Sequence, residues 1–145
     1  MKLIDVTERL RNARFLRFGI VGAGGFVVDT VVLYFLFQRL GLPYPVARAI
    51  SIFTAMNFTW VGNRFLTFRA EAASQPAAVA GEWFRFLATN AVGATVNWAV
   101  SNMLVQWAPR PASNPYFALC MGVAVGLVFN FTLSRRFVFR ARSPD

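Results

Sequence analysis

Four apolar runs along the chain are each long enough to form a membrane-spanning helix. They cover Phe18–Phe37, Tyr44–Val61, Phe86–Trp107 and Tyr116–Leu133. An α-helix crosses the ~30 Å hydrocarbon core of a bilayer in about 20 apolar residues. Gly41–Pro45 separates the first two runs and Pro109–Pro115 the last two, and segments so rich in proline and glycine stop helices. The pattern predicts an all-α integral membrane protein with four transmembrane helices in two hairpins.

The two predicted hairpins repeat one sequence pattern. Phe15–Phe18 returns as Trp83–Phe86, each time before a run rich in small residues, and each half ends in a basic, aromatic tail, Asn63–Arg69 or Ser134–Arg140. This indicates a duplication of about seventy residues. Because each copy holds an even number of spans, both copies enter the membrane from the same side, which predicts parallel repeats.

The repeat divides the chain into five segments. We expect an N-terminal segment at 1–14, a first two-helix repeat at 15–69, a flexible linker at 70–82, a second repeat at 83–140 and a tail at 141–145. Apolar residues recur at helical spacing in the first segment, at Leu3, Val6, Leu10 and Ala13. This spacing predicts a short amphipathic helix on the inner membrane surface. A simple basic anchor is the alternative.

Composition also indicates a membrane protein. Apolar residues make up 57% of the chain and six side chains are acidic, so a soluble domain of this size would expose too much hydrocarbon. The net charge of +9 does not predict nucleic-acid binding, because the basic residues flank the apolar runs instead of gathering on a polar domain. Histidine is absent, and the single cysteine, Cys120, lies in the last apolar run. We therefore expect no metal, no cofactor and no enzymatic activity.

The basic residues predict the orientation in the membrane. All fifteen Lys and Arg residues except Arg39, Arg48 and Arg110 lie in the N-terminal segment, the middle connector or the C-terminal tail. By the positive-inside rule, these three regions face the cytoplasm and the hairpin turns face the other side.

Two ionisable residues lie inside the first predicted hairpin. Asp29 is near the middle of its span and Arg48 is about one turn inside the next. Because such charges are costly in a membrane unless they are paired, and the helices are antiparallel neighbours, we expect an ion pair. The repeat places Asn97 opposite Asp29 and Ala118 opposite Arg48, so the second copy lacks both charges. The pair has either a structural role or a role in binding and gating.

Amide side chains form a second candidate group. Asn90, Asn97 and Ser101 share one face of the third predicted helix. Asn57 and Asn130 lie toward the cytoplasmic ends of the second and fourth. Together they can line a hydrated groove, with interhelical hydrogen bonding as the alternative.

Arginines recur beside phenylalanines at the predicted cytoplasmic side. The set comprises Arg17, Arg64, Arg85, Arg135 and Arg136. A guanidinium binds phosphate in two-pronged geometry, and the neighbouring rings suit a lipid chain, so the set is a candidate site for a lipid phosphate. Each arginine can also serve only as a topology anchor.

These motifs, from Phe15 to Arg140, resemble the GtrA-like family: Arg-Phe before a glycine-rich span, Asn57-Phe58 before Arg64–Phe68, and Asn130-Phe131 before Arg135–Phe139. The two asparagines lie at different distances from the basic motif that follows. The resemblance implies a small multi-pass protein of the bacterial plasma membrane that moves a polyprenyl-phosphate-linked sugar to the outer leaflet for cell-surface polysaccharide synthesis. It would bind the phosphate through the arginines and the sugar in a groove lined by Asp29, Asn90 and Asn97.

Two other classes of membrane protein stay open. A non-transporting subunit that anchors or regulates a glycosyltransferase would need the same helices, with every polar residue used for packing. A small proton-coupled multidrug exporter would also place one acid in its first span. Four helices enclose little space, so we also expect a homodimer.

Overall fold

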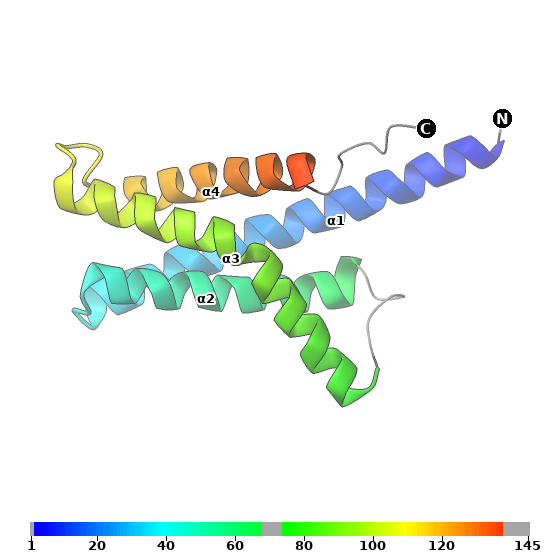
Figure 1. Ribbon diagram of the computed structural model, residues 1–145, viewed down its shortest axis with the longest axis horizontal. Helices are drawn as coiled ribbons and strands as arrows, with labels where there is room; N and C mark the ends of the chain where they lie inside the picture. The colour runs from blue at the N-terminus through cyan, green and yellow to red at the C-terminus, as the bar shows by residue number, and fades with distance from the viewer. Residues whose placement is uncertain (1, 68–73, 138–145) are drawn as a thin grey trace.

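The computed structural model describes the backbone of residues 2–67 and 74–137 and the side chains of residues 16–67 and 74–129. Within these ranges the chain forms helices joined by turns (Figure 1). The elements in order are α1 (Lys2–Leu33), the π-helix η1 (Tyr34–Arg39), α2 (Tyr44–Gly62), the π-helix η2 (Asn63–Thr67), α3 (Pro76–Trp107) and α4 (Pro115–Phe137). The predicted all-helical fold is therefore confirmed.

The helices are arranged as two antiparallel hairpins, α1 with α2 and α3 with α4 (Figure 1). Gly41 has a φ of +67° in the first turn, a left-handed conformation that glycine adopts without steric cost. In the second turn, the Asn114 side chain caps α4 by accepting a hydrogen bond from the Tyr116 amide at 3.0 Å. The Tyr44 hydroxyl donates to the Pro115 carbonyl at 3.2 Å. Both turns therefore lie side by side at one end of the molecule.

The N-terminal segment does not form a separate helix. It is helical, as predicted, but α1 continues without a break from Lys2 to Leu33 (Figure 1). Residues 2–18 contain neither glycine nor proline, so no residue in this stretch interrupts the helix. The side chains of residues 2–15 lie outside the described residues, so the amphipathic surface helix stays a prediction.

The predicted linker is shorter than expected. Residues 70–82 were expected to be flexible, but α3 begins at Pro76. Proline fits the first turn of a helix, where its missing amide hydrogen bond costs nothing. The alanines that follow, Ala77, Ala78 and Ala80, are strong helix formers. Glu82 and Trp83 therefore belong to the second and third turns of a helix, and residues 68–73 lie outside the described residues.

Composition marks one described helical segment, Leu16–Arg39, as long and apolar enough to cross a membrane, with a mean hydropathy of 2.0. Pro115–Phe129 is apolar but shorter. The predicted spans in α2 and α3 coincide with helices of 19 and 32 residues, which carry polar side chains in their middle turns. Their crossing of the membrane stays a prediction.

The outer surface of the helices is apolar. Large hydrophobic side chains are exposed on each helix, among them Phe26 of α1, Val46 of α2, Phe84 of α3 and Leu127 of α4. The buried apolar cluster is small and lies near the turns, where Leu33, Tyr44, Ala47 and Leu119 meet. Lipid hydrocarbon tolerates apolar side chains on a protein surface, so an apolar exterior around a small buried core suits a protein in a membrane.

Small residues bring the helices of each hairpin into close contact. A Cβ atom added to Gly126 of α4 would lie 2.7 Å from the Gly93 carbonyl oxygen of α3, and one added to Gly62 of α2 would lie 2.8 Å from the Val21 side chain of α1. Backbones can approach this closely only where a side chain is missing. Figure 1 shows that α3 and α4 lie together near their turn and diverge toward the N-terminal half of α3.

Candidate functional site

Arg48 is the centre of a buried polar cluster between the two hairpins. Its Nη1 atom donates to Asp29 Oδ1 at 2.6 Å and to Ser51 Oγ at 3.0 Å. Its Nη2 atom donates to Asn97 Oδ1 at 2.8 Å. The exposed fraction is 0% for Arg48 and 4% for Asp29. The predicted ion pair is thus present, and the cluster joins α1, α2 and α3.

The cluster offsets the free-energy cost of burying the positive charge of Arg48. A guanidinium removed from water loses several kcal/mol of solvation, which an adjacent carboxylate and further hydrogen bonds offset. The two outer nitrogens of Arg48 make these contacts, and its Nε atom has no hydrogen-bond partner among the described atoms. Because Asp29 neutralises Arg48 at contact distance, the pair as a whole carries no net charge.

Asn97 is a partner of Arg48 that the polar pattern of the individual spans does not reveal. The repeat alignment contains the signal, since it places Asn97 at the position of Asp29. Arg48 therefore contacts both members of this equivalent pair, one through each outer nitrogen. Ala118, at the position equivalent to Arg48, is fully buried. Ser51 is the remaining partner of Arg48. Its position one turn along the same helix is the one feature of the sequence that indicates this contact.

The polar face of α3 is used mainly for helix contacts. Ser101 Oγ donates to the Asn97 carbonyl at 2.8 Å and is fully buried. Asn90 Nδ2 donates to the Phe86 carbonyl, one turn back on its own helix, at 2.8 Å. Both side chains donate within their own helix, and the predicted groove along this face stays a prediction.

The second predicted amide position makes a contact between the hairpins. Asn57 Oδ1 accepts a hydrogen bond from Trp83 Nε1 at 2.8 Å, which connects α2 to the beginning of α3. Trp83 had been noted only as part of the repeat motif. The side chain of Asn130 lies outside the described residues.

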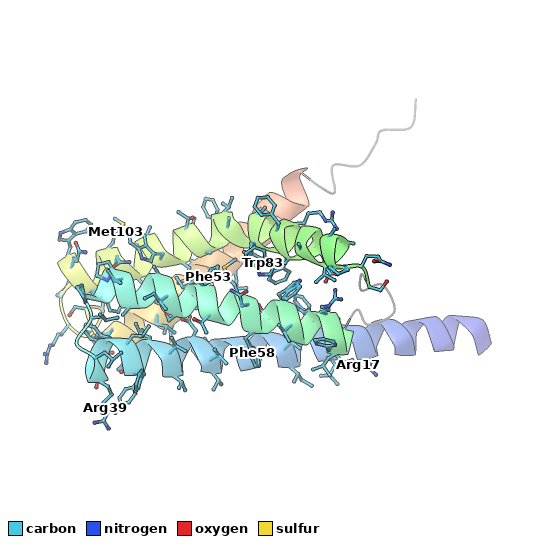
Figure 2. The ribbon with its side chains drawn as sticks, turned by 90° about the horizontal axis from the view of Figure 1, so that it is seen from below. Arg17, Arg39, Phe53, Phe58, Trp83 and Met103 are labelled. Atoms are coloured by element: carbon cyan, nitrogen blue, oxygen red, sulfur yellow. The ribbon has the colours of Figure 1, made fainter. Side chains whose placement is uncertain are left out.

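Three of the five predicted phosphate ligands, Arg17, Arg64 and Arg85, lie at the end of the molecule opposite the turns, which we call the basic end. Figure 2 shows Arg17 and Arg39 at opposite ends of the first hairpin. Arg17 Nη1 donates to the Leu66 carbonyl in η2 at 3.4 Å. Arg85 is exposed on α3. The side chains of Arg135 and Arg136 lie outside the described residues.

Arg64 is held more firmly than the other two arginines. Its Nη1 atom lies 2.6 Å from Glu82 Oε2 on α3. Its guanidinium carbon is 5.9 Å from the centre of the Trp60 ring and 6.0 Å from that of Phe65, within the range of cation–π attraction. Glu82 was expected in a linker without a site, and only the helical start of α3 brings it to Arg64.

A cavity of about 410 Å³ lies between α2 and α3. Its wall includes Ile52, Phe53 and Met56 of α2 and Leu87, Ala94 and Trp98 of α3. Phe53, labelled in Figure 2, lies on the side of α2 that faces α3. The wall is apolar, and none of the residues predicted to line a sugar groove belongs to it. This cavity suits a hydrocarbon chain better than a sugar.

The helical fold, the apolar exterior and the compensated buried charge define an α-helical membrane protein. The family model described as GtrA/DPMS, transmembrane domain, matches residues 17–139, so the chain belongs to this family. The resemblance inferred from the arginine and asparagine motifs is thereby confirmed. Searches of curated proteins and of solved structures gave no match.

Proposed function

We propose that this protein moves a polyprenyl-phosphate-linked sugar from the cytoplasmic to the outer leaflet of the bacterial plasma membrane, for the synthesis or modification of a cell-surface polysaccharide. In this proposal all four helices span the membrane, the termini and the basic end face the cytoplasm, and the protein catalyses no bond-breaking step. Membership of the GtrA/DPMS family supports a role in handling lipid-linked sugars.

The observation that carries the proposal is the position of the cavity relative to the basic end. Leu87, in the cavity wall, is at nearly the same level along α3 as Arg85, which points to another face of the helix, and Met56 of α2 lies eight residues before Arg64 of η2. We infer that a prenyl chain in the apolar cavity would bring its phosphate to the level of these arginines, whose guanidinium groups bind phosphate strongly. The proposal thus gives the prenyl chain and the phosphate separate, adjacent sites.

The buried cluster has a supporting role in this proposal. Because Arg48 joins the hairpins through Asp29 and Asn97, it holds α1, α2 and α3 together while a lipid occupies the space between α2 and α3. A direct contact of these side chains with the sugar would require them to leave their present partners.

A flipping assay with matched arginine variants tests the proposal. The protein is placed in phosphatidylcholine vesicles with farnesyl-phosphate-glucose in the outer leaflet, and protection of the glucose from external periodate is followed over time. We expect Arg85→Gln to slow flipping roughly ten-fold, the effect of losing one charge-assisted hydrogen bond. Arg39→Gln, at the opposite end, is the control and should leave the rate unchanged. Equal rates with and without protein would contradict the proposal.

The second candidate is a subunit that anchors or regulates a glycosyltransferase. One observation favours this candidate: Arg48 forms hydrogen bonds with Asp29 and Asn97 within the structure. Contacts between helices are therefore enough to explain why these polar residues are present. Purification in mild detergent separates the two candidates. A transferase in fixed proportion, without a prenyl-phosphate lipid, would support the subunit.

The third candidate, a proton-coupled exporter, is the least compatible with the site. Such a protein needs an acid that binds protons and cations in turn. Arg48 lies 2.6 Å from Asp29 and competes with any cation for that carboxylate.

A further inference from the structure

Glu82 and Arg64 form a partly exposed ion pair at the basic end, beside the cavity. The side chain of Arg64 is 13% exposed and that of Glu82 is 27% exposed. Water and ions can therefore reach the pair, unlike the sealed pair of Asp29 and Arg48. The aromatic rings of Trp60 and Phe65 restrict the Arg64 guanidinium further. The carboxylate is consequently the partner that can be exchanged while the guanidinium stays in place.

A carboxylate and a phosphate bind a guanidinium in the same way. Both present oxygen atoms at hydrogen-bond distance to the nitrogens, and both are favoured by the positive charge. A lipid phosphate at Arg64 would also lie close to the negative charge of Glu82, because Glu82 Oε2 is 2.6 Å from Arg64 Nη1. The two negative charges therefore repel each other, and each weakens the binding of the other at this guanidinium.

We propose that Glu82 is an internal competitor that occupies Arg64 until a lipid phosphate displaces it. This inference rests on the proposed function, and it concerns regulation of the same site. When Glu82 is displaced, the Arg64 guanidinium binds the phosphate instead. Phosphate binding must therefore supply the free energy needed to break the ion pair, which lowers the affinity for the phosphate.

The same contact also joins the start of α3 to η2, next to the end of α2. Glu82 bonds to Arg64, and its neighbour Trp83 donates to Asn57 at 2.8 Å. These two adjacent residues tie the start of α3 to α2 through Asn57 and to η2 through Arg64, about one turn before Leu87 in the cavity wall. Displacement of Glu82 removes one of these ties at the end of the cavity nearest the phosphate. Phosphate binding and release of α3 are thus coupled, and each favours the other.

The test measures binding of geranylgeranyl phosphate to the full-length protein in phosphatidylcholine nanodiscs by native mass spectrometry. Geranylgeraniol, which lacks the phosphate, is the control ligand. We expect Glu82→Gln to bind the phosphate about two- to five-fold more tightly, the effect of removing a partly exposed ion pair. Its affinity for geranylgeraniol should not change. Glu82→Ser, too short to reach Arg64, should behave in the same way and replaces the first variant if that one fails to fold.

Arg64→Gln separates competition from a general effect of charge. Loss of any negative charge near a phosphate site strengthens anion binding somewhat, whichever residue binds the anion. Competition for Arg64 predicts that Glu82→Gln has no effect in the Arg64→Gln background. An equal gain in both backgrounds would overturn the competitor role.

The outcomes also distinguish this inference from the proposed function. Suppose the unaltered protein prefers the phosphate to the alcohol, and Glu82→Gln binds the phosphate no more tightly. The competitor role is then wrong and the phosphate site stands. A protein that does not distinguish the phosphate from the alcohol has no phosphate site, which would overturn both.

Discussion

Arg48 Nη2 of the first hairpin donates a hydrogen bond to Asn97 Oδ1 of the second hairpin at 2.8 Å. Around this bond the packing is tight, because a Cβ atom added to Gly122 of α4 would lie 2.5 Å from the same Oδ1 atom. One asparagine therefore contacts α2 through its oxygen and α4 through its close packing. We expect the association of the hairpins to depend strongly on it.

Replacing Asn97 should weaken the contact between the hairpins. Asn97→Leu leaves Arg48 Nη2 buried without an acceptor, and we expect it to lower the free energy of unfolding by about 1–3 kcal/mol. The matched control is Asn90→Leu on the same helix, because Asn90 bonds only to its own helix among the contacts described above and should cost less than about 1 kcal/mol. Unfolding in dodecyl sulfate, followed by tryptophan fluorescence, measures both. Equal losses would argue against a special role of Asn97.

Removing the charge of Asp29 should be more damaging than removing the whole pair. Asp29→Asn leaves the buried Arg48 without its counter-charge, and we expect a loss of about 3–5 kcal/mol. The double variant Asp29→Leu with Arg48→Met buries no charge and should recover most of that loss. The same unfolding experiment applies. If Asp29→Asn is as stable as the unaltered protein, the ion pair contributes nothing to stability.

The glycines of α1 and α4 should respond in opposite ways to an added methyl group. In Gly126→Ala the new Cβ would lie 2.7 Å from a backbone oxygen of α3, so the helices must move apart at a cost of about 1–3 kcal/mol. In Gly22→Ala no atom lies within 4 Å of the new Cβ. This control should be neutral or more stable by about 0.5–1 kcal/mol, because alanine favours a helix. Thermal unfolding in detergent compares the two, and a destabilised Gly22→Ala would show that the exposed face of α1 has a partner.

The proposed orientation predicts which turns are accessible from outside the cell. Cys120 is exposed on α4, so it is first replaced by serine. New cysteines are then placed one at a time at Arg110, in the second turn, and at Ser74, before α3, both of which are exposed. A membrane-impermeant maleimide added to intact cells should label position 110 and not position 74. The reverse pattern would invert the topology.

The pairing of Asp29 with Arg48 was predictable because its physical cause is local. A charge in an apolar run needs a partner, and a short turn makes the two helices neighbours. The turns themselves were predictable for a similar reason, since Gly41 and the prolines act on their own stretch of backbone. Family membership followed from motifs that recur in both halves of the chain.

The contacts of Glu82 and Trp83 were not predictable from the sequence. They depend on where α3 begins, and an alanine-rich stretch of this composition suits a linker as well as a helix. They also depend on how α3 packs against the end of α2, and neither the internal repeat nor the spacing of residues predicts this packing. The cavity between α2 and α3 has the same origin, because its walls are ordinary apolar residues that the arrangement of two helices brings together.

The buried ion pair has a consequence for how the chain enters the membrane. Asp29 and Arg48 are separated by 19 positions and belong to the same hairpin. In the proposed topology, the two buried charges can therefore pair within the first hairpin, without a contribution from the second. Asn97 later supplies an uncharged acceptor, so the second hairpin completes the cluster without bringing a charge of its own into the bilayer. If the four helices span the membrane as proposed, insertion can thus proceed one hairpin at a time, with neither Asp29 nor Arg48 left unpaired in the lipid.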